Sequence, residues 1–138
     1  MIYSMFAMIL LTVAVAGYLL KLRVDAVKKG EVRLSSFRLN NLEGIPANMI
    51  QASRNYSNLF EMPVLFYCAA ILAFFLHLDT PAMLVLSWLF VVSRVVHSWI
   101  HITSNNVIRR MQVFMAGNIC ILLMWIILVW GYTAAAHQ

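Results

Sequence analysis

Four long apolar stretches dominate the sequence and limit the folds that it can adopt. They run approximately over Ile2–Leu22, from Pro46 or Arg54 to His77, and over Pro81–Ile102 and Val107–Tyr132. Each stretch is near the ~20 residues that a helix needs to cross ~30 Å of hydrocarbon. The strands of a membrane β-barrel would instead alternate apolar and polar residues over about 10 positions, and the run ILLMWIILVW does not alternate. The sequence therefore predicts an all-α membrane protein whose four transmembrane helices form one domain over residues 1–138.

The composition agrees with this class. Hydrophobic residues make up 63% of the 138 residues and charged residues only 11%, whereas soluble domains average about 45–50% apolar residues. The first stretch lacks a basic leading region, and its apolar run is longer than the ~7–15 residues of a signal peptide. We therefore expect residues 2–22 to form the first transmembrane helix.

The basic residues are unevenly distributed between the connections. Six of the ten Lys and Arg residues lie in or beside the first connection: Lys21, Arg23, Lys28, Lys29, Arg33 and Arg38. Arg109 and Arg110 follow the third connection, and neither the second connection nor the two ends of the chain carry any. By the positive-inside rule, the first and third connections face the cytoplasm. Both termini are then expected on the non-cytoplasmic side.

The second and third connections are short, so consecutive helices should be antiparallel neighbours in an up-down bundle. Thr80 is placed to cap the 81–102 helix, with Pro81 at its first position. The segment TSNN at 103–106 offers several caps for the 107–132 helix. The first connection, about Val24–Gly44, is polar and basic and has room for short helices.

Polar residues recur at helical spacing near the cytoplasmic ends of two expected helices. Arg54, Asn58 and Glu61 fall within about 60° of one another on a helix. The second set, Arg94, His97 and His101, also falls within about 60°. A charge at the bilayer centre costs about 2.5–3.5 kcal/mol and less near the interface. Such clusters therefore indicate either a structural or a functional role.

Several structural interpretations remain open for these residues. A salt bridge between Glu61 and Arg94 would fix the register of two helices, and His97 and His101 would serve as hydrogen-bonded packing residues. The two histidines share a helix face, but only Glu61 is near as a third ligand and no HExxH motif is present. We therefore expect no metal.

The arginines beside the third connection also have a simple interpretation, because basic side chains near a membrane interface extend toward water. One of Arg109 and Arg110 suffices for that role. Arg110, Phe114 and Asn118 follow one another at intervals of four, so Arg110 begins a mildly polar helix face.

Together these residues predict a pocket for a small, polyanionic, peptide-like ligand at the cytoplasmic ends of the helices. Arginines would bind its carboxylates, Glu61 would bind an ammonium group, and Asn58 can both donate and accept hydrogen bonds. Lys21 and Arg23 add positive charge at the end of the 2–22 helix. No Ser-His-Asp set, carboxylate pair for acid–base catalysis or Gly-rich phosphate loop accompanies the pocket, and no nucleic acid is expected as a partner.

The pattern resembles the MAPEG family, the membrane-associated proteins in eicosanoid and glutathione metabolism. The family's second-helix signature is an arginine, an asparagine four residues later, a glutamate three further on and a nearby proline. Here it is Arg54, Asn58, Glu61 and Pro63. The third-helix signature, an arginine and a histidine three residues later, matches Arg94 and His97. A cytoplasmic arginine near the fourth helix is best matched by Arg110, and the resemblance covers almost the whole chain.

This resemblance implies a homotrimer that binds glutathione between neighbouring subunits and uses it as a co-substrate. The second substrate, a lipophilic electrophile or a lipid hydroperoxide, would arrive from the membrane lipid. By analogy, Arg110 would stabilise the glutathione thiolate, and Lys21 or Arg23 would hold a carboxylate. The remaining residues expected to contact or position glutathione are Arg54, Asn58, Glu61, Arg94, His97, His101 and Arg109.

The sequence departs from the family pattern at three positions. His101 and Phe114 stand where several eukaryotic members have tyrosine, and Pro63 follows the glutamate slightly sooner than in some members. The departures argue against a prostaglandin or leukotriene synthase. They favour the bacterial branch of the family, and hence a location in a bacterial inner membrane. The expected function is that of a glutathione transferase or peroxidase. The alternative is a non-catalytic lipid-binding or scaffold member. A four-helix multidrug exporter would need an acidic residue in its first helix, and residues 2–22 contain none.

Overall fold

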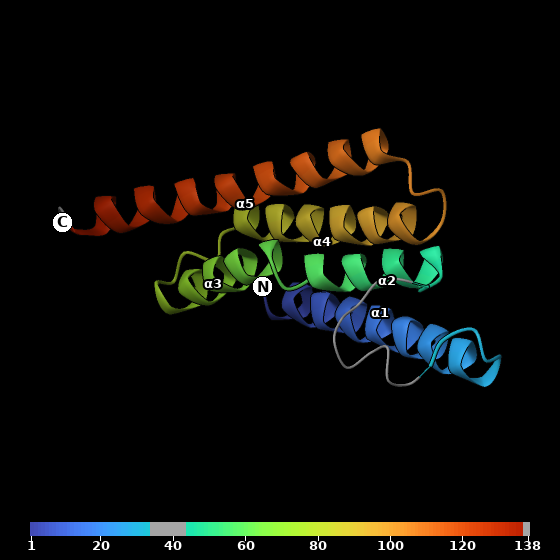
Figure 1. The fold of residues 1–138 in the computed structure, drawn as a ribbon. Helices are drawn as coiled ribbons and strands as arrows, with labels where there is room; N and C mark the ends of the chain where they lie inside the picture. Colours follow the sequence, from blue (N-terminus) through green and yellow to red (C-terminus); the bar gives the residue numbers. More distant parts are fainter. Residues whose placement is uncertain (34–43, 137–138) are drawn as a thin grey trace.

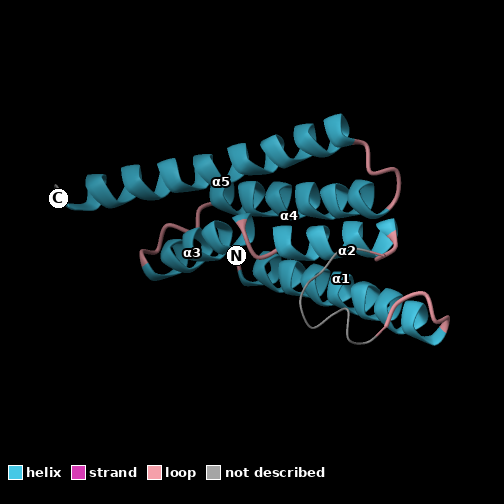
Figure 2. Cartoon of the chain, viewed as in Figure 1, coloured by secondary structure: helices cyan, strands magenta, loops and turns pink. Residues whose placement is uncertain are grey.

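The computed structural model describes residues 1–33 and 44–136. Five α-helices follow one another in this part of the chain (Figure 1): α1 (Ile2–Lys28), α2 (Ala47–Asn58), α3 (Met62–Phe75), α4 (Pro81–Ile102) and α5 (Val107–Ala136). Figure 2 shows no strand among these residues. Four segments are long and apolar enough to cross a membrane, and α2 and α3 together make one of them, Ala47–Phe75. The prediction of an all-α, multi-pass membrane protein with four spans is confirmed.

The helices form an up-down bundle around α4. α4 contacts all the others, most extensively α5. Figure 1 shows the chain entering α2 at the end of the bundle where α4 passes into α5. The C-terminus and the connection between α3 and α4 lie at the opposite end, toward which the N-terminal end of α1 also points. Alternate connections thus lie at opposite ends, as the short links predicted.

The second span differs from its prediction, because the expected continuous helix over 46–77 is broken. α2 ends at Asn58 and α3 begins at Met62. Pro63 explains the break, since a proline ring inside a helix clashes with the carbonyl four residues earlier, here that of Leu59. In the first turn of α3, the proline lacks only an N–H that would have no helical partner anyway. The span therefore changes direction between Leu59 and Glu61.

The outer helices are longer than predicted. α1 continues to Lys28, so the start of the expected connection at Val24 belongs to a helix. α5 continues to Ala136 rather than ending at Tyr132. The short helices expected in the first connection fall largely on residues 34–43, including Arg38, which lie outside the described residues.

The capping predictions are confirmed at the N-terminal ends of α4 and α5. The Thr80 hydroxyl accepts a hydrogen bond from the Met83 amide at 3.3 Å, with Pro81 in the first position of α4. Asn106 Oδ1 accepts a hydrogen bond from the Arg109 amide at 3.1 Å at the start of α5. These side chains satisfy amides that have no partner within their own helices.

The larger hydrophobic cluster lies where α1, α3, α4 and α5 meet, and a smaller one lies between α1 and α2. The rings of Phe66 and Phe90 stack with their centroids 4.8 Å apart, and Met83 and Met124 are fully buried beside them. α4 and α5 approach closely at Gly117, where an added Cβ would lie 2.5 Å from Ser93 Oγ. Small residues allow this kind of contact between membrane helices, whose association depends on close packing.

Candidate functional site

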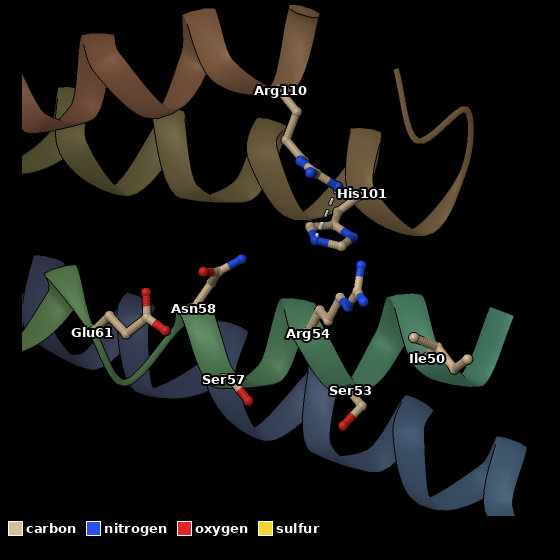
Figure 3. A pocket seen from close by; sticks show the side chains of 8 residues that line it. All are labelled: Ile50, Ser53, Arg54, Ser57, Asn58, Glu61, His101 and Arg110. Atoms are coloured by element: carbon tan, nitrogen blue, oxygen red, sulfur yellow. Dashed lines mark hydrogen bonds between the residues drawn. The ribbon is translucent and has the colours of Figure 1, made fainter. Parts of the chain in front are cut away.

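A polar pocket of about 350 Å³ lies between α2, the break in the second span, α4 and α5. Its volume is within the range of about 300–1,000 Å³ typical of small-molecule sites. Figure 3 shows the lining residues, which are Ile50, Ser53, Arg54, Ser57, Asn58, Glu61, His101 and Arg110. Five of these, Arg54, Asn58, Glu61, His101 and Arg110, are residues that the sequence predicted for the ligand site.

One face of α2 supplies most of the lining. Ile50, Ser53, Arg54, Ser57 and Asn58 recur once per helical turn, at intervals of three or four residues from the preceding turn, so they share a face of the helix. Glu61 reaches the same pocket from the break between α2 and α3. The predicted grouping of Arg54, Asn58 and Glu61 therefore holds, although not on a continuous helix.

Arg110 enters the pocket from the first turn of α5. Its Nη1 donates a hydrogen bond to Asn105 Oδ1 at 2.7 Å and lies 3.3 Å from His101 Nε2, which accepts when the ring proton is on Nδ1. Figure 3 shows Arg110 and His101 pointing toward each other. Within residues 1–33 and 44–136, Arg110 forms no ion pair. Its guanidinium is thus oriented by uncharged acceptors, and no carboxylate in the described part of the chain neutralises its positive charge.

Asn105 was predicted only as one of several possible caps, and its contact with Arg110 was missed. It has a φ of 48°, and its amide donates to the Ile100 carbonyl at 2.7 Å. Asparagine adopts this left-handed conformation more readily than most residues. The turn that ends α4 therefore fixes the side chain that holds Arg110.

Sequence reasoning also missed Ile50, Ser53 and Ser57. Their spacing from Arg54 and Asn58 was a usable signal, because residues three or four apart share a helix face. In Figure 3 the hydroxyls of Ser53 and Ser57 point away from His101 and Arg110. These serines contribute to the wall of the pocket but do not converge on its charged groups.

Arg94 lies behind the pocket rather than in its lining. It is 1% exposed, and its Nη2 donates to the Asn58 carbonyl at 3.2 Å. Its guanidinium carbon lies 5.7 Å from the centroid of the Phe114 ring. The considered salt bridge between Glu61 and Arg94 is not formed in the described part of the chain. That interpretation was wrong because the guanidinium is directed to the end of α2 instead.

His97 is also buried, with 3% of its surface exposed. Its ring lies edge to face with that of His101, at 5.7 Å between centroids, and 5.9 Å from the ring of Phe114. In this setting His97 packs against aromatic rings. The described residues contain no group of three His, Cys, Asp or Glu side chains that could hold a metal ion.

The other predicted basic residues do not line this pocket. Lys21 and Arg23 are exposed on α1, and Arg109 is exposed at the start of α5. Adjacent residues on a helix point about 100° apart, so only one of Arg109 and Arg110 can face the pocket. The structure places Arg110 there.

The pocket thus combines two arginines, Arg54 and Arg110, with one carboxylate, Glu61, and the amide of Asn58. Arginines suit carboxylates and thiolates, and a carboxylate suits an ammonium group. This set of groups matches a zwitterionic ligand that carries excess negative charge.

Comparison with known proteins identifies the family of this chain. The model of the MAPEG family matches residues 1–130. No curated protein and no solved structure matches the chain. Because the family match extends into all four spans and includes every residue of the pocket, this multi-pass membrane chain belongs to the MAPEG family.

Proposed function

We propose that this protein is a membrane-bound, glutathione-dependent transferase or peroxidase. The family includes glutathione transferases and peroxidases as well as non-catalytic members. The observation that carries the proposal is the state of Arg110, a cation that faces the pocket and that, among the described residues, is held by the uncharged Asn105 and His101. A non-catalytic pocket has no need for an arginine whose charge is kept available in this way.

The chemistry requires the glutathione sulfur as a thiolate, which is the nucleophilic form. An adjacent cation lowers the pKa of a thiol from its usual value of about 8.5. Arginine remains protonated, so Arg110 would act as an electrostatic stabiliser of the thiolate and not as a base. Neutral acceptors orient its guanidinium without cancelling its positive charge.

Two reactions are open to such a thiolate. In the transferase reaction, the sulfur forms a bond to an electrophilic carbon, and a leaving group departs or the product takes up a proton. In the peroxidase reaction, the sulfur attacks a hydroperoxide oxygen and the O–O bond breaks, which releases an alcohol. A second glutathione then reduces the sulfenic acid to give water and glutathione disulfide.

The other charged groups would orient glutathione in the pocket. Arg54 suits one carboxylate, Glu61 suits the ammonium group of the γ-glutamyl residue, and Asn58 can donate to or accept from a peptide group. Arg94 and His97 would support these groups from behind. The second substrate would be a lipophilic electrophile or lipid hydroperoxide that arrives from the membrane lipid.

Lys21, Arg23 and Arg109 do not line the pocket of this chain. As part of the proposal, the protein is a homotrimer in which each glutathione lies between neighbouring subunits, so that basic residues of another chain complete the site. We also propose a bacterial inner membrane, with the pocket on the cytoplasmic side and both termini on the other. Crosslinking in detergent tests the assembly, and a monomer would contradict a site shared between subunits.

The proposed function is tested with purified protein in nanodiscs. Glutathione binding is measured by calorimetry, and turnover is measured with 1-chloro-2,4-dinitrobenzene and with cumene hydroperoxide. Arg110→Ala should lower kcat by roughly 10²–10³-fold, the size of effect seen when one stabiliser of developing charge is removed. Arg109→Ala is the matched control and should retain most of the activity, while Arg54→Ala should chiefly raise the KM for glutathione.

Two outcomes would contradict the proposal in different ways. Absence of both glutathione binding and turnover would remove the enzyme function and favour the non-catalytic, lipid-binding or scaffold alternative. Full activity of Arg110→Ala would show that another group stabilises the thiolate.

A further inference from the structure

Arg94 is a charged side chain buried inside a membrane-spanning helix, away from the pocket lining. Only 1% of its surface is exposed, and a charge within a membrane span is costly unless it is paired or hydrogen-bonded. In the described part of the chain it forms no ion pair. Because burying this charge is unfavourable, we expect Arg94 to have a specific structural or functional role.

The hydrogen bond of Arg94 indicates that role. Asn58 is the last residue of α2, and the final carbonyls of a helix have no partner within the helix. In an apolar environment an unsatisfied carbonyl is expensive. Arg94 Nη2 donates to the Asn58 carbonyl at 3.2 Å, and its positive charge is also favourable at the C-terminal end of a helix dipole.

The Asn58 carbonyl lacks a helical partner because Pro63 breaks the second span. A continuous span would pair the Asn58 carbonyl with the amide of Met62, which instead begins α3. The guanidinium supplies a replacement donor at the point where the helix stops. The sequence thus contains both the residue that interrupts the span and the residue that stabilises its interrupted end.

A second polar contact supports the same alignment of helices. Ser98 lies one turn beyond Arg94 on α4, and its hydroxyl donates to Asn55 Oδ1 at 3.1 Å in a buried position. Asn55 lies about one turn before Asn58 on α2. The two contacts together fix the register of α2 against α4, and hence the height of Asn58 and Glu61 in the pocket.

We infer that Arg94 is a positioning residue that caps the interrupted end of α2 and so presents Asn58 and Glu61 to the pocket. It acts through the backbone of Asn58 and does not touch the ligand. The part of this inference that concerns ligand binding rests on the proposed function, whereas the capping of α2 does not.

The capping is tested by hydrogen exchange on ligand-free protein in nanodiscs. The amides of Leu59 and Phe60, which bond to the carbonyls of Tyr56 and Ser57, report on the break. Loss of a hydrogen bond to a charged group should raise their exchange in Arg94→Met by roughly tenfold or more. Arg94→Lys keeps a cationic donor and should restore much of the protection.

Val95→Met is the matched control, because Val95 is the next residue on α4 and its side chain is 47% exposed. It should leave exchange at the break unchanged. If Arg94→Met does not assemble, Arg94→Gln replaces it, and the exchange rates should then rise in the order wild type, Arg94→Lys, Arg94→Gln. Equal exchange at Leu59 and Phe60 in these proteins would overturn the inference.

A second measurement separates positioning from direct contact. In Arg94→Met the KM for glutathione should rise about tenfold while kcat at saturation falls less than threefold, because Arg110 is untouched; this estimate assumes the loss of one charge-assisted hydrogen bond. A fall in glutathione affinity with no change in ligand-free exchange would show that Arg94 binds the ligand directly, and would overturn the inference. If wild-type protein binds no glutathione, the proposed function fails, and the exchange data still decide the capping.

Discussion

Arg110 donates a hydrogen bond of 2.7 Å from Nη1 to the side-chain oxygen of Asn105. The acceptor is an uncharged amide on a residue held at a φ of 48° by the turn between α4 and α5. A carboxylate at the same place would hold the guanidinium equally well but would cancel its charge. The choice of asparagine therefore fixes the direction of Arg110 and leaves its electrostatic field directed at the pocket.

Replacing this amide by a carboxylate is the sharpest test of that relationship. Asn105→Asp changes one atom, and aspartate also tolerates the left-handed conformation. Its negative charge beside Arg110 should weaken stabilisation of the thiolate, so kcat/KM should fall by about 10–100-fold, the range expected for a lost charge interaction of about 1.4–2.7 kcal/mol. The pH at which bound glutathione ionises, followed by thiolate absorbance, should rise in parallel.

The control for this substitution is Asn106→Asp. It adds the same charge one residue away, where the side chain accepts from the Arg109 amide at 3.1 Å and a carboxylate is also a good cap. Its activity should stay within about threefold of wild type, since a weak surface charge effect is below 1 kcal/mol. Equal losses in the two variants would mean that general charge, and not the bond to Arg110, controls the reaction.

Glu61 provides a test of how the ligand is oriented. If its carboxylate binds the ammonium group of glutathione, wild-type protein should prefer glutathione to an analogue that lacks the amino group, by about 10-fold or more. In Glu61→Gln this preference should largely disappear, because the amide lacks the charge. Competition binding of the two ligands to both proteins measures it. An undiminished preference in Glu61→Gln would place the ammonium group elsewhere.

The buried contact between Asn55 and Ser98 should contribute to stability. Ser98→Ala removes the donor and leaves Asn55 Oδ1 buried without this partner, which should cost about 1–3 kcal/mol in the free energy of unfolding. Unfolding in mixed micelles measures the loss. The double variant Asn55→Leu with Ser98→Ala should recover much of it, because an apolar pair leaves no buried polar group unsatisfied. No loss in Ser98→Ala would show that the contact is energetically neutral.

The close approach at Gly117 should reveal coupling between α4 and α5. In Gly117→Ala the new Cβ would lie 2.5 Å from Ser93 Oγ, so the steric cost should offset the gain of about 1 kcal/mol from better helix propensity. In a Ser93→Ala background that oxygen is absent, and the same substitution should stabilise the protein. Thermal unfolding of the four proteins gives the double-mutant cycle. Identical effects of Gly117→Ala in both backgrounds would mean that Ser93 moves aside freely.

The chain's sequence was sufficient to predict the class of fold. Four apolar runs of membrane-spanning length, joined partly by short links, allow little besides an antiparallel helical bundle. The caps Thr80 and Asn106 were also predictable, because capping depends on side chains within a few residues of the amides they bind. The break in the second span was equally local, since Pro63 acts on the residue four positions earlier, but the length of the apolar run concealed it.

Contacts between helices were harder to predict from the sequence than these local features. Helical spacing correctly grouped Arg54, Asn58 and Glu61, yet it suggested that Arg94 pairs with Glu61, whereas Arg94 bonds to the Asn58 carbonyl. Angular position on a helix tells which neighbours a side chain faces, but not which acceptor atom its tip reaches. That depends on the relative height of α2 and α4 and on where α2 ends.

The same limit applied to the two arginines of α5. Their sequence positions require that they point in different directions, because one residue of helix advances about 100°. Which one faces the pocket depends on how α5 is rotated against α4, with which it packs closely at Gly117. The sequence alone thus determined the spans and the candidate polar residues through local periodicity and favoured Arg110 over Arg109. Only the tertiary structure placed Arg110 in the same pocket lining as Arg54, Asn58 and Glu61, because that outcome depends on contacts between helices.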